Sequence, residues 1–131
     1  DLFCGSGALG IEAYSRGASR VGFVDRFCEP VHQNLEKVGV SQPVVRSSAD
    51  RFLKKCTESF DVIFLDPPWT QPGLFESTLK LIVGFDILAP NGVVVCEHPK
   101  EVEFDRLEGW EIKSTHKYGR THITIFSLLN G

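Results

Sequence analysis

The sequence predicts an α/β protein with a mostly parallel sheet, and three observations lead to this fold class. Short apolar runs alternate with stretches of helical periodicity along almost the whole chain. The run Phe60–Leu65 is continuously apolar apart from one acid, as in strands that are covered on both faces. The last two apolar runs are joined only by Tyr118-Gly119-Arg120, which predicts an antiparallel hairpin at one edge of the sheet.

The first half of the chain contains two helices between short strands. Residues 1–3 resemble the end of a strand, so we expect the chain to carry a truncated first strand. The glycine-rich stretch that follows opens a helix to about residue 17, and residues 21–25 form a strand that ends in an acid. The helix Glu29–Val38 is predicted because Pro30 suits a first turn and apolar residues recur every three or four positions.

The second half repeats this alternation and closes with the hairpin. We expect a strand at 43–46, a short helix at about 51–55, the strand Phe60–Leu65, a helix at about 74–83, a turn at 90–92, and strands at 93–97, 110–117 and 122–129. Ligands of such sheets bind at the carboxyl ends of the strands.

Composition bounds the class of protein. With 131 residues, 42% hydrophobic residues and 24% charged residues, we expect one soluble domain, residues 1–131. No apolar run approaches the roughly 20 residues of a membrane span, and no signal peptide is present. The four cysteines are far apart and include no C-x-x-C pair, so we expect free thiols in a reducing cytoplasm. The four histidines show no metal-ligand spacing, so no metal site is expected.

The most informative motif is Asp66-Pro67-Pro68-Trp69, directly after the strand Phe60–Leu65. Each proline fixes its own φ angle and lacks an N–H donor, which makes this edge stiff and rich in acceptors. A planar ring with an exocyclic amine could donate to the carboxylate and the carbonyls while it stacks on the indole. The alternative is a proline-terminated strand followed by a surface tryptophan.

The glycine-rich loop suggests a cofactor. Gly5, Gly7 and Gly10 match G-x-G-x-x-G between a strand and a helix, and Asp25 ends the next strand, where a carboxylate can bind a ribose diol. These features fit NAD and S-adenosylmethionine almost equally, and a tight turn followed by a strand-ending acid is the structural alternative. Asp50 could accept a hydrogen bond from an adenine amine or could be a helix N-cap. Asp1 could face the cofactor or bind nearby backbone N–H groups.

Taken in order, Asp1–Gly7, Asp25, Asp50 and the motif at 66–69 resemble the S-adenosylmethionine-dependent amino-methyltransferases. The run 1–18 and the sequence Tyr118-Gly119-Arg120-Thr121 resemble, more narrowly, the RsmD-type family of bacterial 16S rRNA (guanine-N2)-methyltransferases. The resemblance covers essentially the whole chain. It implies a Rossmann-like class I methyltransferase fold with a seven-stranded type of sheet.

The resemblance also implies roles for individual residues. Asp1, Gly5 and Gly7 would border the methionine part of S-adenosylmethionine, Asp25 would hold the ribose, and Asp50 with Arg51 or Phe52 would hold the adenine. Asp66 and the Pro67 carbonyl would bind the guanine N2 amine, Pro68 would stiffen this edge, and Trp69 would stack on the base. The family's basic N-terminal RNA-binding segment is absent from this sequence.

The expected partner is 16S rRNA or a small-subunit assembly intermediate, bound by a cytoplasmic monomer without a metal or a membrane. Three alternatives remain. One is a different methyl acceptor, adenine N6 in DNA or a protein glutamine. Another is a nicotinamide-dependent oxidoreductase, which leaves the motif at 66–69 unexplained. The last is an inactive domain that binds cofactor or nothing.

Overall fold

The computed structural model describes residues 1–104 and 107–129. Helices and strands alternate along the described chain in the order α1 (Ala8–Ser15), β1 (Phe23–Asp25), α2 (Glu29–Val38), β2 (Val44–Arg46), α3 (Ala49–Lys55), β3 (Phe60–Leu65), α4 (Gly73–Gly84), β4 (Leu88–Pro99), β5 (Trp110–Tyr118) and β6 (Thr121–Leu128). The prediction of an α/β protein is therefore confirmed.

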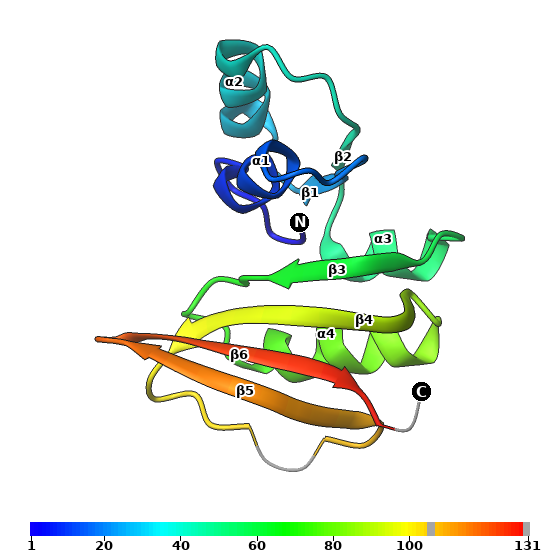
Figure 1. The fold of residues 1–131 in the computed structure, drawn as a ribbon, viewed down its shortest axis with the longest axis vertical. Helices are drawn as coiled ribbons and strands as arrows, with labels where there is room; N and C mark the ends of the chain where they lie inside the picture. The colour runs from blue at the N-terminus through cyan, green and yellow to red at the C-terminus, as the bar shows by residue number, and fades with distance from the viewer. Residues whose placement is uncertain (105–106, 130–131) are drawn as a thin grey trace.

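The strands form two hydrogen-bonded groups that meet at one residue. β1 pairs with β2 in parallel, and the second group has the order β3-β4-β6-β5. Leu2 makes parallel bridges to Val24 of β1 and to Leu65 of β3, so it lies between the two groups. Figure 1 shows β1 and β2 toward one end of the molecule and the β5–β6 hairpin at the other. β6 runs antiparallel to both β4 and β5, which confirms the predicted closing hairpin.

Two elements agree with the sequence prediction at both ends because strong local signals set their limits. α2 has Pro30 in its first turn and ends at Gly39, whose φ of 69° is the left-handed conformation of a helix C-cap. Its Val31 and Leu35 are buried, as its apolar periodicity predicts. β3 ends at Leu65 because two prolines follow within three residues and cannot donate to a strand ladder.

The turn predicted at residues 90–92 is wrong. β4 is continuous from Leu88 to Pro99, and the residues expected to form the turn are absorbed as an irregularity within it. The ladder with β3 pairs Phe60 with Leu88 and then Val62 with Val93, and Asn91 adopts a φ of 64°. A bulge of this kind accommodates proline, asparagine and glycine without reversing the chain.

The buried side chains form two apolar clusters. The larger cluster covers β3, β4, α3 and α4 and includes Leu2. Trp110 belongs to it, and its indole N–H donates a hydrogen bond of 3.2 Å to the Leu79 carbonyl. The smaller cluster lies under α1 and α2 and contains Cys4, Val21, Phe23, Cys28, Val31 and Leu35. All four cysteines are free thiols, as predicted. No helix among the described residues is long and apolar enough to cross a membrane.

Candidate active site

The predicted site residues gather at one edge of the sheet because the strands that carry them are parallel. β1 ends at Asp25, β3 ends immediately before Asp66, and the chain around Leu2 runs parallel to both. The glycine loop follows Leu2 at the same edge, and Asp50 lies just beyond β2. This is the edge at which parallel α/β sheets bind their ligands.

The glycine loop has the geometry of a close approach to a ligand. Gly5 adopts a φ of 54°, and a Cβ atom added there would have no neighbour within 4 Å. The space beside the Gly5 backbone is therefore open, and a side chain would partly fill it. Gly10 serves packing, because a Cβ at this position would lie 2.4 Å from Cε1 of the buried Phe23 ring. It allows α1 to lie directly against β1.

Two carboxylates hold the loop in place. The Oδ2 atom of Asp25 accepts a hydrogen bond of 2.8 Å from the Gly5 N–H, and Oδ1 accepts one of 3.1 Å from the Phe27 N–H. The Asp1 carboxylate accepts a hydrogen bond of 3.0 Å from the Gly10 N–H in the first turn of α1. The alternative considered for Asp1, that it binds nearby backbone N–H groups, is therefore what the structure shows. Each oxygen of Asp25 retains a second lone pair for a further donor.

Asp50 lies in the first turn of α3, but it is not the N-cap. Ser48 occupies that position, so the N-cap alternative for Asp50 is wrong. A hydrogen bond from the Ser48 side chain, strengthened by neighbouring backbone N–H groups, lowers the pKa of Asp50 below its usual value. The Asp50 carboxylate is exposed and ionised near neutral pH. It is available to a donor at the carboxyl edge of β2.

Arg51 and Phe52 do not share this position. Arg51 is exposed, whereas Phe52 is half-buried and packs against the larger apolar cluster. Its ring also lines the cavity at the opposite edge of the sheet, which is described below. The structure therefore separates Phe52 from the carboxyl-end edge at which Asp50 lies.

The motif at 66–69 forms a stiff corner at the end of β3. Pro67 is buried, and the Pro68 carbonyl accepts a hydrogen bond of 2.9 Å from the Gln71 N–H within the following turn. No hydrogen bond to the Pro67 carbonyl occurs within residues 1–104 and 107–129. The prediction that the carbonyls of both prolines point outward as free acceptors is thus wrong for Pro68.

Trp69 offers a partly open aromatic surface beside these acceptors. Its side chain is 43% exposed. It borders an open groove of about 660 Å³ that is also lined by Pro72, Gly73, Pro99, Glu101, Val102 and Glu103. A planar ring stacked on the indole would lie in this groove, next to the Asp66 carboxyl group.

The Asp66 carboxyl group has an unusual charge environment. Burial, together with the neighbouring Glu97 carboxylate, raises the pKa of Asp66 to about 7, while the Trp69 side chain acts in the opposite direction. The two acids are brought together by the ladder, because Leu65 pairs with Cys96 and Asp66 and Glu97 are the next residues on the two strands. No local pattern indicates this pair, since its members are 31 positions apart in the sequence.

His98 has a structural position one residue beyond Glu97. It is 2% exposed, and its Nδ1–H donates to the Pro99 carbonyl at 2.9 Å. Its Nε2 atom accepts a hydrogen bond of 2.7 Å from the Thr124 hydroxyl. Burial lowers the pKa of His98, so the ring is neutral near pH 7. His98 is thus a buried member of β4.

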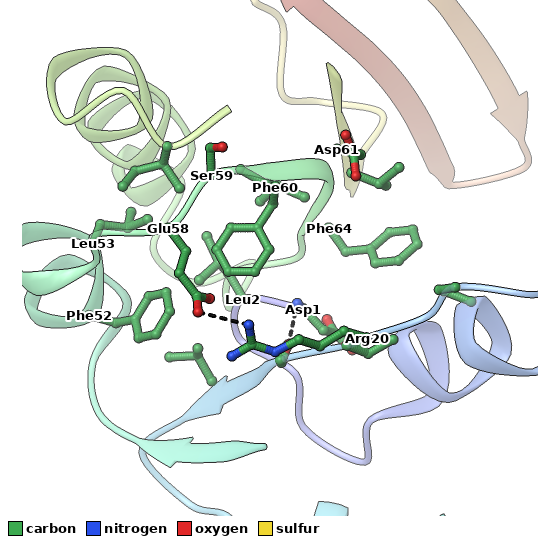
Figure 2. A pocket seen from close by; sticks show the side chains of 18 of the residues that line it. Asp1, Leu2, Arg20, Phe52, Leu53, Glu58, Ser59, Phe60, Asp61 and Phe64 are labelled. Carbon is green, nitrogen blue, oxygen red and sulfur yellow. Dashed lines mark hydrogen bonds and ion pairs between the residues drawn. The ribbon is translucent and has the colours of Figure 1, made fainter. Parts of the chain in front are cut away.

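A cavity lies toward the opposite edge of the sheet. It has a volume of about 740 Å³ and is lined by Val21 and Gly22 before β1, by residues 58–64 before and along β3, and by Phe52 and Leu53 of α3. Figure 2 shows the rings of Phe52 and Phe60 at this cavity, with the ion pair between Arg20 and Glu58 beside it. Two of the predicted cofactor residues, Asp1 and Phe52, line this cavity, whereas Gly5, Asp25, Asp50 and Asp66 do not.

The described residues contain no group of three or more histidine, cysteine or acidic side chains that could hold a metal ion. The two cysteines at this edge, Cys4 and Cys96, are protonated thiols and not thiolates. Burial, with a contribution from the Asp25 carboxylate, raises the pKa of Cys4 to about 12, and burial raises the pKa of Cys96 further. The functional groups of this edge are therefore carboxylates, backbone groups and one indole.

Comparison with known proteins places the chain in a family. The family model described as Conserved hypothetical protein 95 matches residues 1–127. The chain belongs to this RsmD-type methyltransferase family. Among the relatives of this chain, the Bacillus subtilis protein YlbH is 38% identical over 96% of this chain and 73% of its own length. The ribosomal RNA small subunit methyltransferase D of Buchnera aphidicola is 30% identical over 99% of this chain and 69% of its own length.

More distant and structural matches agree with this assignment. The tRNA (guanine(10)-N2)-dimethyltransferase of Methanocaldococcus jannaschii is 30% identical over 96% of this chain, which covers 39% of that enzyme. The crystal structure of the Haemophilus influenzae protein HI0767 has a TM-score of 0.86 and 30% identity, and it covers 99% of this RsmD-type chain and 85% of its own. A Streptococcus pyogenes protein gives a TM-score of 0.88 at 29% identity, over 96% of this chain and 82% of its own.

Proposed function

We propose that this protein transfers a methyl group from S-adenosylmethionine to the exocyclic N2 amine of a guanine in small-subunit (16S) rRNA. The observation that carries this proposal is the corner at the end of β3. There the Asp66 carboxyl group and the Pro67 carbonyl, to which no described N–H donates, lie beside a half-exposed indole. The two acceptors suit the two N–H bonds of an aromatic amine, and the indole suits its ring.

Two relatives support the choice of acceptor. Ribosomal RNA small subunit methyltransferase D names small-subunit rRNA, and the archaeal tRNA enzyme names the N2 atom of guanine. Both align with 96% or more of this chain, including the corner at 66–69. The base must leave its stack to reach this corner, as in other enzymes that act on an atom within a paired base.

The residues present fit the cofactor. The open space beside Gly5 admits a ligand against the backbone, and the spare lone pairs of Asp25 suit the two ribose hydroxyls. The ionised, exposed Asp50 suits the adenine amine. Asp1 contributes to cofactor binding only indirectly. Its carboxylate accepts the hydrogen bond from the Gly10 N–H, so it holds the start of α1 and does not contact the ligand. We assign the adenine contact to Asp50 and not to Phe52, whose ring packs toward the other edge of the sheet.

The bound cofactor supplies an electrophilic sulfonium methyl group, which bonds to N2 while the electron pair of the broken C–S bond stays with sulfur. The lone pair of an exocyclic amine is delocalised into the ring, so the amine is a weak nucleophile. Hydrogen bonds from its two N–H groups to Asp66 and the Pro67 carbonyl direct the lone pair toward the methyl group. This positioning is the kind of effect that supplies up to several kcal/mol, and the Asp66 carboxylate favours the positive charge that develops on nitrogen.

The sheet supports the same assignment. Leu2 makes parallel bridges to both Val24 of β1 and Leu65 of β3. We propose that a further parallel strand at Leu2 joins the two groups in the order β2, β1, Leu2, β3, β4, β6, β5, which would complete the seven strands of a class I methyltransferase. We propose that residues 1–131 act as one methyltransferase domain, as a monomer in the cytoplasm, on 16S rRNA or a small-subunit assembly intermediate.

The test is methyl transfer from labelled S-adenosylmethionine to small-subunit rRNA, with the modified nucleotide mapped by mass spectrometry. Wild-type protein is expected to yield N2-methylguanosine, and Asp66→Ala is expected to yield none while it binds S-adenosylmethionine with unchanged affinity. Asp61→Asn is the matched control, because this exposed acid lies on the same strand at its opposite end. Methylation of DNA adenine or protein glutamine in place of rRNA would reject the proposal, as would loss of cofactor binding in Asp66→Ala.

A further inference from the structure

The strand ladder brings a second carboxyl group to the proposed catalytic acid. Leu65 of β3 and Cys96 of β4 are paired, both with buried side chains, and each is followed by an acid. Because neighbouring strands lie roughly 5 Å apart, Asp66 and Glu97 project from adjacent backbones at the same edge of the sheet. Both residues are half-buried, and the neighbouring Glu97 carboxyl group contributes to raising the pKa of Asp66.

No cation among the described residues compensates this pair. The ion pairs of the described chain join Arg16 to Glu12, Arg20 to Glu58 and Lys80 to Glu76, all away from this edge. On the other side of β4, the residue paired with Glu97 is the apolar Ile123 of β6. The other side chain that acts on Asp66 is Trp69 in its own loop. Glu97 is therefore the one charged group in the described chain that acts on Asp66.

We propose that Glu97 is a positioning residue for methyl transfer, whose carboxylate on β4 enables Asp66 to take up the proton that the guanine amine releases. This inference rests on the proposed function of Asp66. When N2 gains the methyl group, it carries one proton in excess and a positive charge. The N–H bond then breaks, its electron pair returns to N2, and the proton moves to the Asp66 oxygen that already accepts its hydrogen bond.

An ordinary aspartate is a weak base at neutral pH, because its pKa lies near 4. A negative charge next to an aspartate disfavours ionisation of that aspartate, which makes the aspartate a stronger base. Proton transfer is most efficient when the pKa of the base lies close to the working pH. The raised pKa of Asp66, about 7, agrees with this role.

The experiment compares wild type with Glu97→Gln, which keeps the size and hydrogen bonding of the side chain but removes its charge. Single-turnover methyl transfer is measured from pH 5 to 9, at saturating cofactor and rRNA. In wild type, the rate is expected to rise with pH through about 7, as Asp66 loses its proton. In Glu97→Gln, this rise is expected to move down by about one to two pH units, and the rate at pH 8 is expected to fall several-fold, because Asp66 is then a weaker base.

The matched control is Glu111→Gln, an exposed acid on the edge strand β5, which should leave the pH profile unchanged. Glu97→Asp restores the charge and is expected to recover most of the wild-type profile. A profile in Glu97→Gln that matches wild type, with the variant folded by thermal melting, would overturn the inference.

A second measurement separates this inference from the proposed function. The Asp66 carboxyl carbon is titrated by NMR in the protein without RNA, in wild type and in Glu97→Gln. A drop in the Asp66 pKa in the variant supports the coupling even if the protein methylates a different acceptor. An unchanged Asp66 pKa rejects it even if rRNA methylation is confirmed.

Discussion

The Oδ2 atom of Asp25 accepts a hydrogen bond of 2.8 Å from the backbone N–H of Gly5. The acid that ends β1 thus fixes the loop that precedes α1, across 20 positions of sequence. Sequence spacing alone assigned Asp25 to a ribose. The structure adds that the same carboxylate sets the loop conformation at a residue with a φ of 54°. The two roles can be separated, because an amide oxygen can accept the Gly5 hydrogen bond without carrying charge.

Asp25→Ala is expected to weaken S-adenosylmethionine binding by more than about tenfold, because it removes a charge-assisted acceptor and releases the loop. Asp25→Asn should lie between wild type and Asp25→Ala, because its amide oxygen still holds Gly5. Isothermal titration calorimetry with S-adenosylmethionine measures both. Equal affinities for the two variants would show that the contact with Gly5 does not contribute to cofactor binding.

Trp69→Ala is expected to weaken the binding of substrate RNA by about five- to a hundredfold, because stacking on an aromatic side chain contributes ~1–3 kcal/mol per base. Trp69→Phe keeps a flat ring and should retain most of the affinity. RNA binding is measured by fluorescence anisotropy, and cofactor affinity is measured in parallel as a control. A tryptophan that only packs against the protein would leave RNA binding unchanged in both variants.

The Asp66 carboxyl group should make the stability of the protein depend on pH. Its pKa is raised by folding, from about 4 to about 7, so the folded state binds the proton more tightly than the unfolded state. The stabilisation is fully present below about pH 4 and is lost as the pH rises through about 7. Asp66→Asn removes this titration, and the variant is expected to melt a few degrees above wild type at pH 8. Thermal melts of both proteins at pH 5 and pH 8 measure this difference, and an equal pH dependence would contradict it.

Thr124→Val is expected to destabilise the fold by ~1–3 kcal/mol, because it leaves the buried Nε2 atom of His98 without its donor. Thr124→Ser retains the hydroxyl group and is the matched control for loss of the hydrogen bond. The free energy of unfolding is obtained from urea denaturation. The effect should appear in stability without a change in cofactor affinity, since the His98 ring packs against Phe75 and Phe104 inside the molecule.

Local signals predicted the elements whose limits depend on residues next to them in the sequence. The prolines at 67 and 68 end β3, and Pro30 with Gly39 brackets α2. The prediction failed where the sheet decides the outcome. The residues at 90–92 have the composition of a turn, but β3 pairs with Leu88 before them and with Val93 after them, which holds β4 as one strand.

The same distinction applies to the site. Asp25 and Asp66 end strands, so their position at the binding edge follows from the element order. Ser48 and Asp50 both favour the start of a helix, and composition does not decide which of them is the N-cap. The contact of Glu97 with Asp66 depends on the register of two strands, and the inward packing of Phe52 depends on which face of α3 meets the sheet.

The double bridge of Leu2 has a consequence for folding cooperativity. The glycine loop and Asp25 belong with the smaller apolar cluster, whereas the strand that carries Asp66 belongs with the larger one. Leu2, a member of the larger cluster, also pairs with β1, so it lies at the boundary between two regions that can differ in local stability. A ligand that contacts Gly5 and lies within reach of Asp66 contacts both regions. Binding of the methyl donor should therefore slow amide hydrogen exchange on both sides of Leu2 together, so that the two regions unfold locally as one unit.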